Sequence, residues 1–163
     1  ELGPLLTNFV VIARSGTAIS TELANMKVHG EVRALDAMGI DPFVYLVIPR
    51  VLGVAASTFC LTIIFLGVTF IGGYFCLWAI MLGDLDIGLF LGNIIGSITG
   101  TDVFTLLAKS ILPGMLTGAI CCDEGLGVGA AATEVPIAAA RGVMRAVAAL
   151  FVTSLLISVM AYL

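Results

Sequence analysis

The chain has 163 residues, of which 60% are hydrophobic and 11% are charged, and its formal net charge is −4. Soluble domains carry about 25% charged residues, so this chain has too few charges to cover a water-facing surface. Its seven Lys and Arg residues form no patch or run, which argues against a nucleic-acid partner. The composition predicts an integral membrane protein.

The first apolar block, residues 2–26, predicts a membrane span over about 3–26 and contains two charges, Arg14 and Glu22. A charge at the depth of Arg14 costs about 2.5–3.5 kcal/mol on insertion scales, so its side chain should have a partner. Glu22 is two helical turns away, roughly 12 Å along the axis, which is too far for a direct pair. We expect Arg14 either to lock helices together through an acid on another span or to contact a phosphate-bearing lipid.

A short amphipathic helix is predicted next, over 27–38. Its apolar residues fall on one stripe at helical spacing: Val28, Val32, Leu35 and Met38. Gly39 fits the position just after a helix, and Asp41-Pro42 fits the cap and first residue of the helix that follows. The pattern predicts a helix on the cytoplasmic face and then an elbow into the membrane. On spacing alone, a helix that merely rests on lipid fits equally well.

Residues 51–82 carry no charge for 32 positions. A helix of that length would reach roughly 48 Å, against a hydrocarbon core of about 30 Å. We therefore expect a span over about 50–76 that tilts, emerges from the membrane or breaks, with Gly72-Gly73 as the weakest point.

Residues 84–102 are apolar and carry a glycine at every fourth position: Gly88, Gly92, Gly96 and Gly100. On a helix these glycines form a stripe that lets a neighbouring helix approach closely. We expect a re-entrant or interfacial helix on the outer side, with a loosely ordered glycine-rich loop as the alternative. Two further spans are predicted over about 103–122 and 142–163.

The basic residues predict the orientation of the chain. The connections 22–50 and 123–145 hold Lys27, Arg33, Arg50, Arg141 and Arg145, whereas 83–102 holds no basic residue. The positive-inside rule places the first two connections in the cytoplasm and the third outside.

The sequence carries no motif for catalysis. It lacks a phosphate-binding loop, a nucleophile elbow and a paired-histidine zinc motif. Its single histidine, His29, lies on the polar side of the amphipathic helix, and its four cysteines have no metal-ligand spacing. Asp123-Glu124 is interpreted as an acidic pair at the membrane edge. We expect no enzyme activity, no metal site and no cofactor.

A resemblance to one family rests on the stretch 3–50, which reads GPLLTNFVVIARSGTAISTELANMKVHGEVRALDAMGIDPFVYLVIPR. The matching elements are Gly3-Pro4, Ala13-Arg14, Gly16, Glu22-Leu23, Met26, Val28, Glu31, Ala34-Leu35, Met38-Gly39, Asp41-Pro42, Tyr45-Leu46 and Pro49-Arg50. The stretch is similar to the signature of the MlaE/YrbE-type permeases, the membrane subunits of ABC transporters that work with MCE-domain lipid-binding proteins. Weaker matches are DVFTLLAKS (102–110) and EVPIAAARGVM (134–144), where Pro136 and Ile137 replace a glycine and an arginine.

The resemblance implies an all-α polytopic transmembrane helical bundle that forms a single permease domain over 1–163. The family's N-terminal interfacial helix and first span are missing, and the chain opens at Glu1, so we interpret it as a fragment of a longer protein. The implied partners are a second copy, an ABC ATPase subunit that hydrolyses ATP, an MCE-domain protein, and membrane lipid (a phospholipid) as substrate. The implied location is a bacterial inner membrane, with an organellar envelope as the alternative.

The resemblance also implies roles for individual residues. By this resemblance, residues of about 27–48 form a coupling helix that docks in a groove of the ATPase. The apolar stripe of Val28, Val32, Leu35 and Met38 would be the part that enters the groove. The residues assigned to ATPase coupling are Glu22, Met26, Val28, Glu31, Val32, Leu35, Met38, Gly39, Asp41 and Pro42. The lipid-path candidates are Leu6, Phe9, Val10 and Arg14. Interhelical roles are assigned to Arg50, Gly92, Gly96, Lys109, Glu134 and Arg141.

Two other classes of protein fit parts of the pattern. A membrane scaffold could recruit the ATPase or the MCE protein without forming the lipid path. An intramembrane enzyme is disfavoured because the chain lacks a nucleophile–base pair.

Overall fold

The computed structural model describes residues 2–80, 96–129 and 131–162, together with residues 88, 92 and 94. The helices in chain order are α1 (Leu2–Val11), η1 (Ile12–Gly16), α2 (Thr17–Val28), α3 (Glu31–Ala37), η2 (Phe43–Val47), α4 (Ile48–Ile80), α6 (Gly100–Leu126), η3 (Ala132–Glu134) and α7 (Val135–Tyr162). The segments η1 and η2 are π-helical, and η3 is a 3₁₀ turn. The described ranges contain no strand, so the all-α prediction is confirmed.

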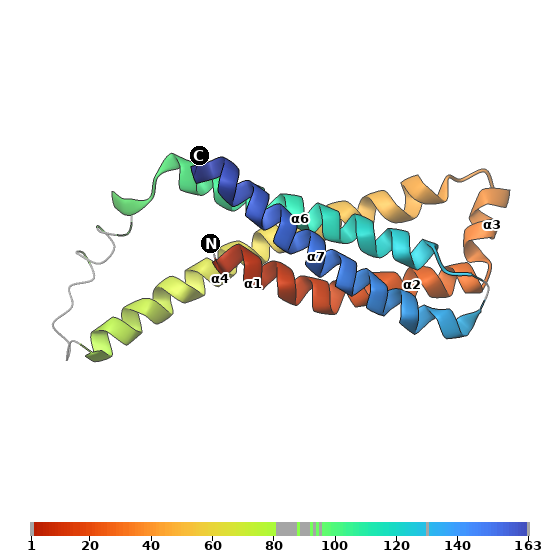
Figure 1. Ribbon diagram of the computed structural model, residues 1–163, viewed down its shortest axis with the longest axis horizontal. Helices are drawn as coiled ribbons and strands as arrows, with labels where there is room; N and C mark the ends of the chain where they lie inside the picture. Colours follow the sequence, from red (N-terminus) through yellow and green to blue (C-terminus); the bar gives the residue numbers. More distant parts are fainter. Residues whose placement is uncertain are drawn as a thin grey trace.

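These elements join into four long helices, each long and apolar enough to cross a membrane: Leu2–Val28, Phe43–Ile80, Gly100–Leu126 and Ala132–Ala161. They pack as an elongated bundle, with α3 at the end far from both chain termini (Figure 1). The predicted polytopic architecture is therefore confirmed. The described residues of the four predicted spans, 3–26, 50–76, 103–122 and 142–163, fall on these helices in chain order.

The second long helix does not break at Gly72-Gly73, where the sequence predicts the weakest point. It runs unbroken to Ile80, and its last turns extend away from the other helices (Figure 1). A helical glycine costs about 1 kcal/mol relative to alanine. An unpaired peptide group in lipid costs several kcal/mol, so the intact helix is the more stable arrangement.

The predicted outer helix over 84–102 falls largely outside the described residues. Gly92 and Gly96 are helical and exposed, and no described neighbour lies within 4 Å of the place where a Cβ would stand. The interhelical role assigned to these two glycines stays a prediction.

The central helix is α6, which contacts α7, α4 and α2. A Cβ atom at Gly125 would lie 2.8 Å from the main-chain oxygen of Ser20, and one at Gly118 would lie 3.0 Å from Cα of Val51. Glycine at these positions lets α6 touch the main chains of α2 and α4. Because lipid tails are as apolar as the side chains, such close contact is a principal source of helix association in a membrane.

Buried hydrogen bonds also join the helices. The Asn8 amide donates to the main-chain oxygen of Lys109 at 3.2 Å, and the Lys109 ammonium donates to Ser158 Oγ at 2.6 Å. On the other side of α6, the Thr58 hydroxyl donates to the main-chain oxygen of Ser110 at 3.2 Å. These bonds connect α1, α4 and α7 to α6 and support the interhelical role predicted for Lys109.

We expect Gly125→Ala to lower the thermal unfolding temperature of the protein in detergent, because the added methyl overlaps the main chain of α2. The expected loss is about 1–3 kcal/mol, the usual range for overpacking. Gly67→Ala is the matched control, since a methyl there has nothing within 4 Å and alanine favours the helix. Equal unfolding temperatures for the two variants would contradict the close-contact role of Gly125.

Candidate functional site

The connection between the first two long helices reverses direction at Gly30. Helix α2 ends at Val28, Gly30 has a φ of +79°, and α3 begins at Glu31. Glycine adopts this left-handed conformation without the steric cost that a Cβ imposes. The predicted continuous helix over 27–38 is therefore wrong, because the segment contains two helices that meet at Gly30.

The other end of α3 agrees with the sequence. Gly39 follows the helix with a φ of +77°, and the Ile40 amide donates to the main-chain oxygen of Leu35 at 3.1 Å. This is the bond expected when a left-handed glycine ends a helix. Asp41 Oδ1 then accepts the Phe43 amide at 2.9 Å and caps the next helix, with Pro42 in its first turn.

The inner side of α3 is packed onto the bundle. Val32 and Leu35 are half-buried on a cluster formed by Leu23, Leu46, Val47 and Cys122, which Met26 also contacts. Val28 packs on a different cluster, which contains Ala24, Val128, Val135 and Ala138. The assignment of Val28, Val32 and Leu35 as anchors for a partner groove stays a prediction, and each of these side chains is already partly covered by the chain's own packing.

The outer side of α3 carries the side chains that a partner can reach. Glu31 and Arg33 are exposed, and Met38 at its end is 65% exposed. A protein that contacts α3 therefore meets charged side chains and one flexible methionine rather than an apolar stripe.

An ion pair joins α2 to α4 beside α3. Arg50 Nη2 lies 3.0 Å from Glu22 Oε1. The Arg50 side chain is largely buried, whereas that of Glu22 is mostly exposed. Glu22 is thus part of a bond between helices, which is the role predicted for Arg50.

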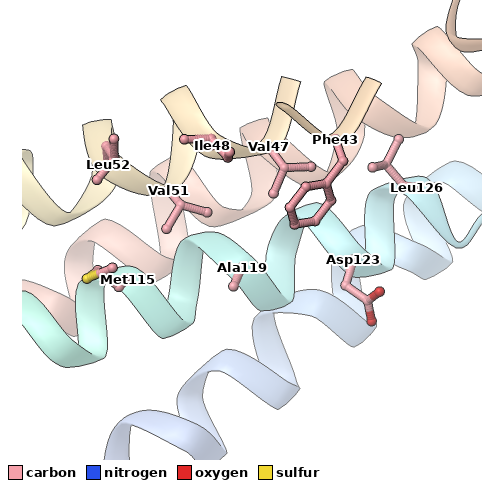
Figure 2. A pocket seen from close by; sticks show the side chains of 9 residues that line it. All are labelled: Phe43, Val47, Ile48, Val51, Leu52, Met115, Ala119, Asp123 and Leu126. Carbon is pink, nitrogen blue, oxygen red and sulfur yellow. The ribbon is translucent and has the colours of Figure 1, made fainter. Parts of the chain in front are cut away.

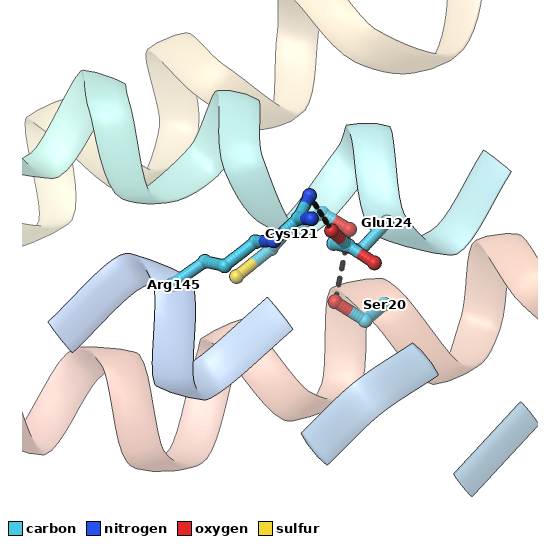
Figure 3. A network of polar contacts seen from close by, with 4 residues as sticks. All are labelled: Ser20, Cys121, Glu124 and Arg145. Carbon is cyan, nitrogen blue, oxygen red and sulfur yellow. Dashed lines mark hydrogen bonds and ion pairs between the residues drawn. The ribbon is translucent and has the colours of Figure 1, made fainter. Parts of the chain in front are cut away.

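A polar network holds α2, α6 and α7 together at the same end of the bundle (Figure 3). Arg145 on α7 forms an ion pair with Glu124 on α6, whose side chain is 9% exposed. The Ser20 hydroxyl donates to the main-chain oxygen of Cys121 at 2.9 Å. The Glu124–Arg145 pair is not predicted from the sequence, because the two residues lie on different helices and no local pattern connects them.

Two further predicted interhelical residues behave differently. Glu134 Oε2 accepts the Gly129 amide at 2.8 Å, so it closes the connection between α6 and α7 rather than joining two helices. Arg141 is exposed and forms no ion pair within the part of the chain that the structure describes.

A narrow apolar groove of about 280 Å³ runs between α1 and α4. Its lining consists of Leu6, Thr7, Val10, Leu61, Ile64, Phe65 and Val68. Leu6 and Val10 are two of the predicted lipid-path residues, whereas Phe9 is exposed but does not line the groove. Apart from the Thr7 hydroxyl, which donates to the main-chain oxygen of Gly3, the side chains of the groove are apolar.

Arg14 lies one helical turn beyond this groove, on the same side of the helix as Val10 and within the π-helical segment η1. Its side chain is exposed and forms no ion pair with a described residue, and Glu22, the nearest acid along the helix, is paired with Arg50. Such π-helical turns inside α-helices frequently mark functional sites. Arg14 is therefore a cation midway along a membrane-spanning helix, beside an apolar groove, and needs an anionic partner.

The comparison with known families decides the class of this bundle. Residues 1–160 match the model of a family described as Permease MlaE. The chain belongs to the Permease MlaE family. The resemblance found in the sequence is thereby confirmed.

Individual relatives of this MlaE family chain agree. A Rickettsia prowazekii protein named "Probable ABC transporter permease protein" is 31% identical over 158 residues, which cover 97% of this chain and 60% of that protein. A Synechocystis protein of the same description is 30% identical, with coverage of 97% and 59%. The Arabidopsis thaliana protein TRIGALACTOSYLDIACYLGLYCEROL 1, chloroplastic is 26% identical, with coverage of 97% and 45%. This MlaE family chain thus spans about 60% of the length of its bacterial relatives.

We expect Arg145→Met to destabilise the folded bundle, because it leaves the nearly buried Glu124 carboxylate without its cation. The loss should be about 1–3 kcal/mol in detergent-induced unfolding, and Glu124→Gln in the same chain should recover part of it. Arg141→Met removes a basic residue of the same helix that has no acid partner, and should change the stability by less than about 0.5 kcal/mol. Equal losses for the two arginine variants would show that the ion pair contributes nothing.

Proposed function

We propose that the chain acts as the membrane permease subunit of an ABC transporter that moves lipid. A separate ATPase subunit drives transport, and the lipid, a phospholipid, passes between the membrane and an MCE-domain protein. Family membership and the names of the relatives support the transporter class. The observation that carries the proposal is α3, a short helix fixed between two left-handed glycines at one end of four long apolar helices.

Helix α3 is the proposed contact with the ATPase. Through Val32 and Leu35 it rests on residues of α2, η2 and α6 at once. An ATPase that closes around ATP and displaces α3 would therefore move several membrane-spanning helices together. The Glu22–Arg50 ion pair adds a second connection between α2 and α4 at this level.

The groove between α1 and α4, with Arg14 at its end, is the proposed lipid path. An acyl chain fits an apolar groove, and the phosphate of the lipid supplies the anion that Arg14 lacks within the described residues. The exposed apolar face of α1, which includes Leu6, Phe9 and Val10, is where a second copy of the chain would complete the cavity.

The proposed location is a bacterial inner membrane, with the end that carries α3 in the cytoplasm. Lys27 is in the last turn of α2, Arg33 is on α3, and Arg141 and Arg145 are in the first three turns of α7. This gathering of basic residues favours the cytoplasmic side under the positive-inside rule. The name of the Arabidopsis relative contains the word chloroplastic, which keeps an organellar envelope as the alternative.

The first test separates docking from packing on α3. Met38→Asp places a charge on an exposed residue, so it should leave the unfolding temperature unchanged while it weakens ATPase binding and lowers lipid transport about tenfold or more, the effect of roughly 1.4 kcal/mol. Leu35→Asp buries a charge in the cluster under α3, so it should lower the unfolding temperature as well. If the double variant Met38→Asp/Glu31→Lys transports lipid normally, α3 does not couple the ATPase to the membrane helices.

The second test separates a permease from a scaffold. A photoactivatable phospholipid should label residues 5–14 in the assembled transporter, and Arg14→Gln should reduce that labelling about fivefold while Arg14→Lys retains most of it. A photoactivatable diacylglycerol, which has no phosphate, should label wild type and Arg14→Gln equally. The exposed face of α4 around Ile63 serves as the reference for nonspecific contact with lipid. If residues 5–14 are labelled no more strongly than this face, the result would favour the scaffold.

A further inference from the structure

A second and larger groove, of about 500 Å³, lies between α4 and α6 at the end of the bundle that carries α3 (Figure 2). Its lining consists of Phe43, Val47, Ile48, Val51, Leu52, Met115, Ala119, Asp123 and Leu126. All of these side chains are apolar except Asp123. The groove between α1 and α4 shares none of these residues, so the two grooves are separate sites.

Asp123 differs from the nearby Glu22 and Glu124 because it forms no ion pair with a described residue. Its neighbour Glu124 is turned into the bundle and paired with Arg145, and the nearby Glu22 is paired with Arg50. Asp123 is exposed and forms no ion pair with any residue that the structure describes. An unpaired carboxylate beside an apolar groove in a membrane attracts a cation more strongly than one in water, because the surrounding dielectric is lower.

The position of Asp123 along the helices matches a lipid of one leaflet. It lies three residues before the end of α6, and Phe43 lies in the first turn of the helix that continues into α4, so both are near the ends of their membrane-spanning helices. Met115, at the deep end of the groove, is eight residues from Asp123, which is about 12 Å along the helix axis. One leaflet of the hydrocarbon core is about 15 Å thick, so the groove follows an acyl chain over most of its length.

The headgroup end of the groove favours an ammonium group. Figure 2 shows the Phe43 ring turned toward α6 at the same end of the groove as Asp123, whose carboxylate points away from α4 in this view. An aromatic ring and a carboxylate both attract an organic cation. An anionic headgroup without an amine would be repelled by Asp123. Two cations lie near this end: Arg50 is engaged by Glu22, and the Lys27 ammonium donates to the main-chain oxygen of Leu126.

We propose that this groove binds a phospholipid whose headgroup carries a free amine, with the ammonium on Asp123 and an acyl chain along Val51, Ala119 and Met115. The site holds an aminophospholipid of the leaflet on the α3 side and discriminates against anionic lipid. The inference rests on the proposed function only in that the protein binds lipid. It adds a selectivity for amine-bearing headgroups, which the groove between α1 and α4 does not supply.

The test compares lipid retention in variants of the full protein. Wild type, Asp123→Asn and Asp36→Asn are placed in nanodiscs of equal phosphatidylethanolamine and phosphatidylglycerol, extracted with mild detergent, and the retained lipids are identified by mass spectrometry. Wild type should retain phosphatidylethanolamine in excess, and Asp123→Asn should reduce that excess about fivefold. Asp36→Asn removes an exposed carboxylate from α3, outside the groove, and should leave the ratio unchanged. Equal lipid ratios in wild type and Asp123→Asn would overturn the site.

A second variant tests the groove itself. Ala119→Trp fills the cavity from an exposed position of α6, so it should remove one tightly retained lipid per chain without lowering the unfolding temperature. An unchanged lipid count would mean that the retained lipid surrounds the bundle rather than occupying the groove. A disulfide between two copies of Ala119→Cys would show that a second chain covers this face, which also overturns the proposal. Because binding is measured without ATP, a failure of transport in the Arg14 variants would leave these results intact.

Discussion

Close contact between main chains at α6 is the constraint on which the rest of the structure depends. Lipid does not drive helices together as water does, so the bundle needs surfaces that fit without intervening side chains. Gly125 supplies one such surface against α2, and Gly118 supplies another against α4. The cluster under α3 draws its residues from α2, η2 and α6, so it exists only where these contacts have brought the three together.

Two sets of charges on the long helices have different roles. Glu22 with Arg50 and Glu124 with Arg145 are paired across helices and hold the bundle at the end that carries α3. Arg14 and Asp123 have no ion-pair partner among the described residues, and each lies beside an apolar groove. The two have opposite sign and lie at different depths, one midway along a long helix and one near a helix end. The cost of an unpaired charge in a membrane is the physical reason to place ligands at these two points and not at the paired ones.

Local structure is predictable from the sequence where a few neighbouring residues decide it. Gly39 and Asp41-Pro42 end one helix and begin the next through bonds within their own segment, and both were predicted. Gly30 is equally local, but the apolar residues on either side of it keep a helical spacing, and periodicity does not detect a single left-handed residue. The break between α2 and α3 was missed for that reason.

Which side chains cover each apolar surface is not predictable from the sequence. The amphipathic pattern of α3 predicts that Val32 and Leu35 are covered by other apolar side chains. Those side chains could belong equally to a partner protein or to the chain's own core. Their cover includes Cys122, which is remote in the sequence. The family resemblance predicts that Leu6 and Val10 line the lipid path. The groove that they line lies between α1 and α4, so its shape depends on how these two helices cross. The Glu124–Arg145 ion pair likewise depends on how two helices are placed, because it forms only at one rotation of α7 relative to α6.

The unbroken second helix has a consequence for the membrane around the protein. Its 38 residues reach about 57 Å. That is nearly twice the thickness of the hydrocarbon core, and tilts of up to about 40° do not absorb the difference. Its far end carries large exposed apolar side chains, including Phe75, Trp78 and Ile80. This hydrophobic mismatch makes the energy of the inserted bundle depend on bilayer thickness, so the protein is most stable where the surrounding lipid is thick or where another apolar surface covers the end of the helix.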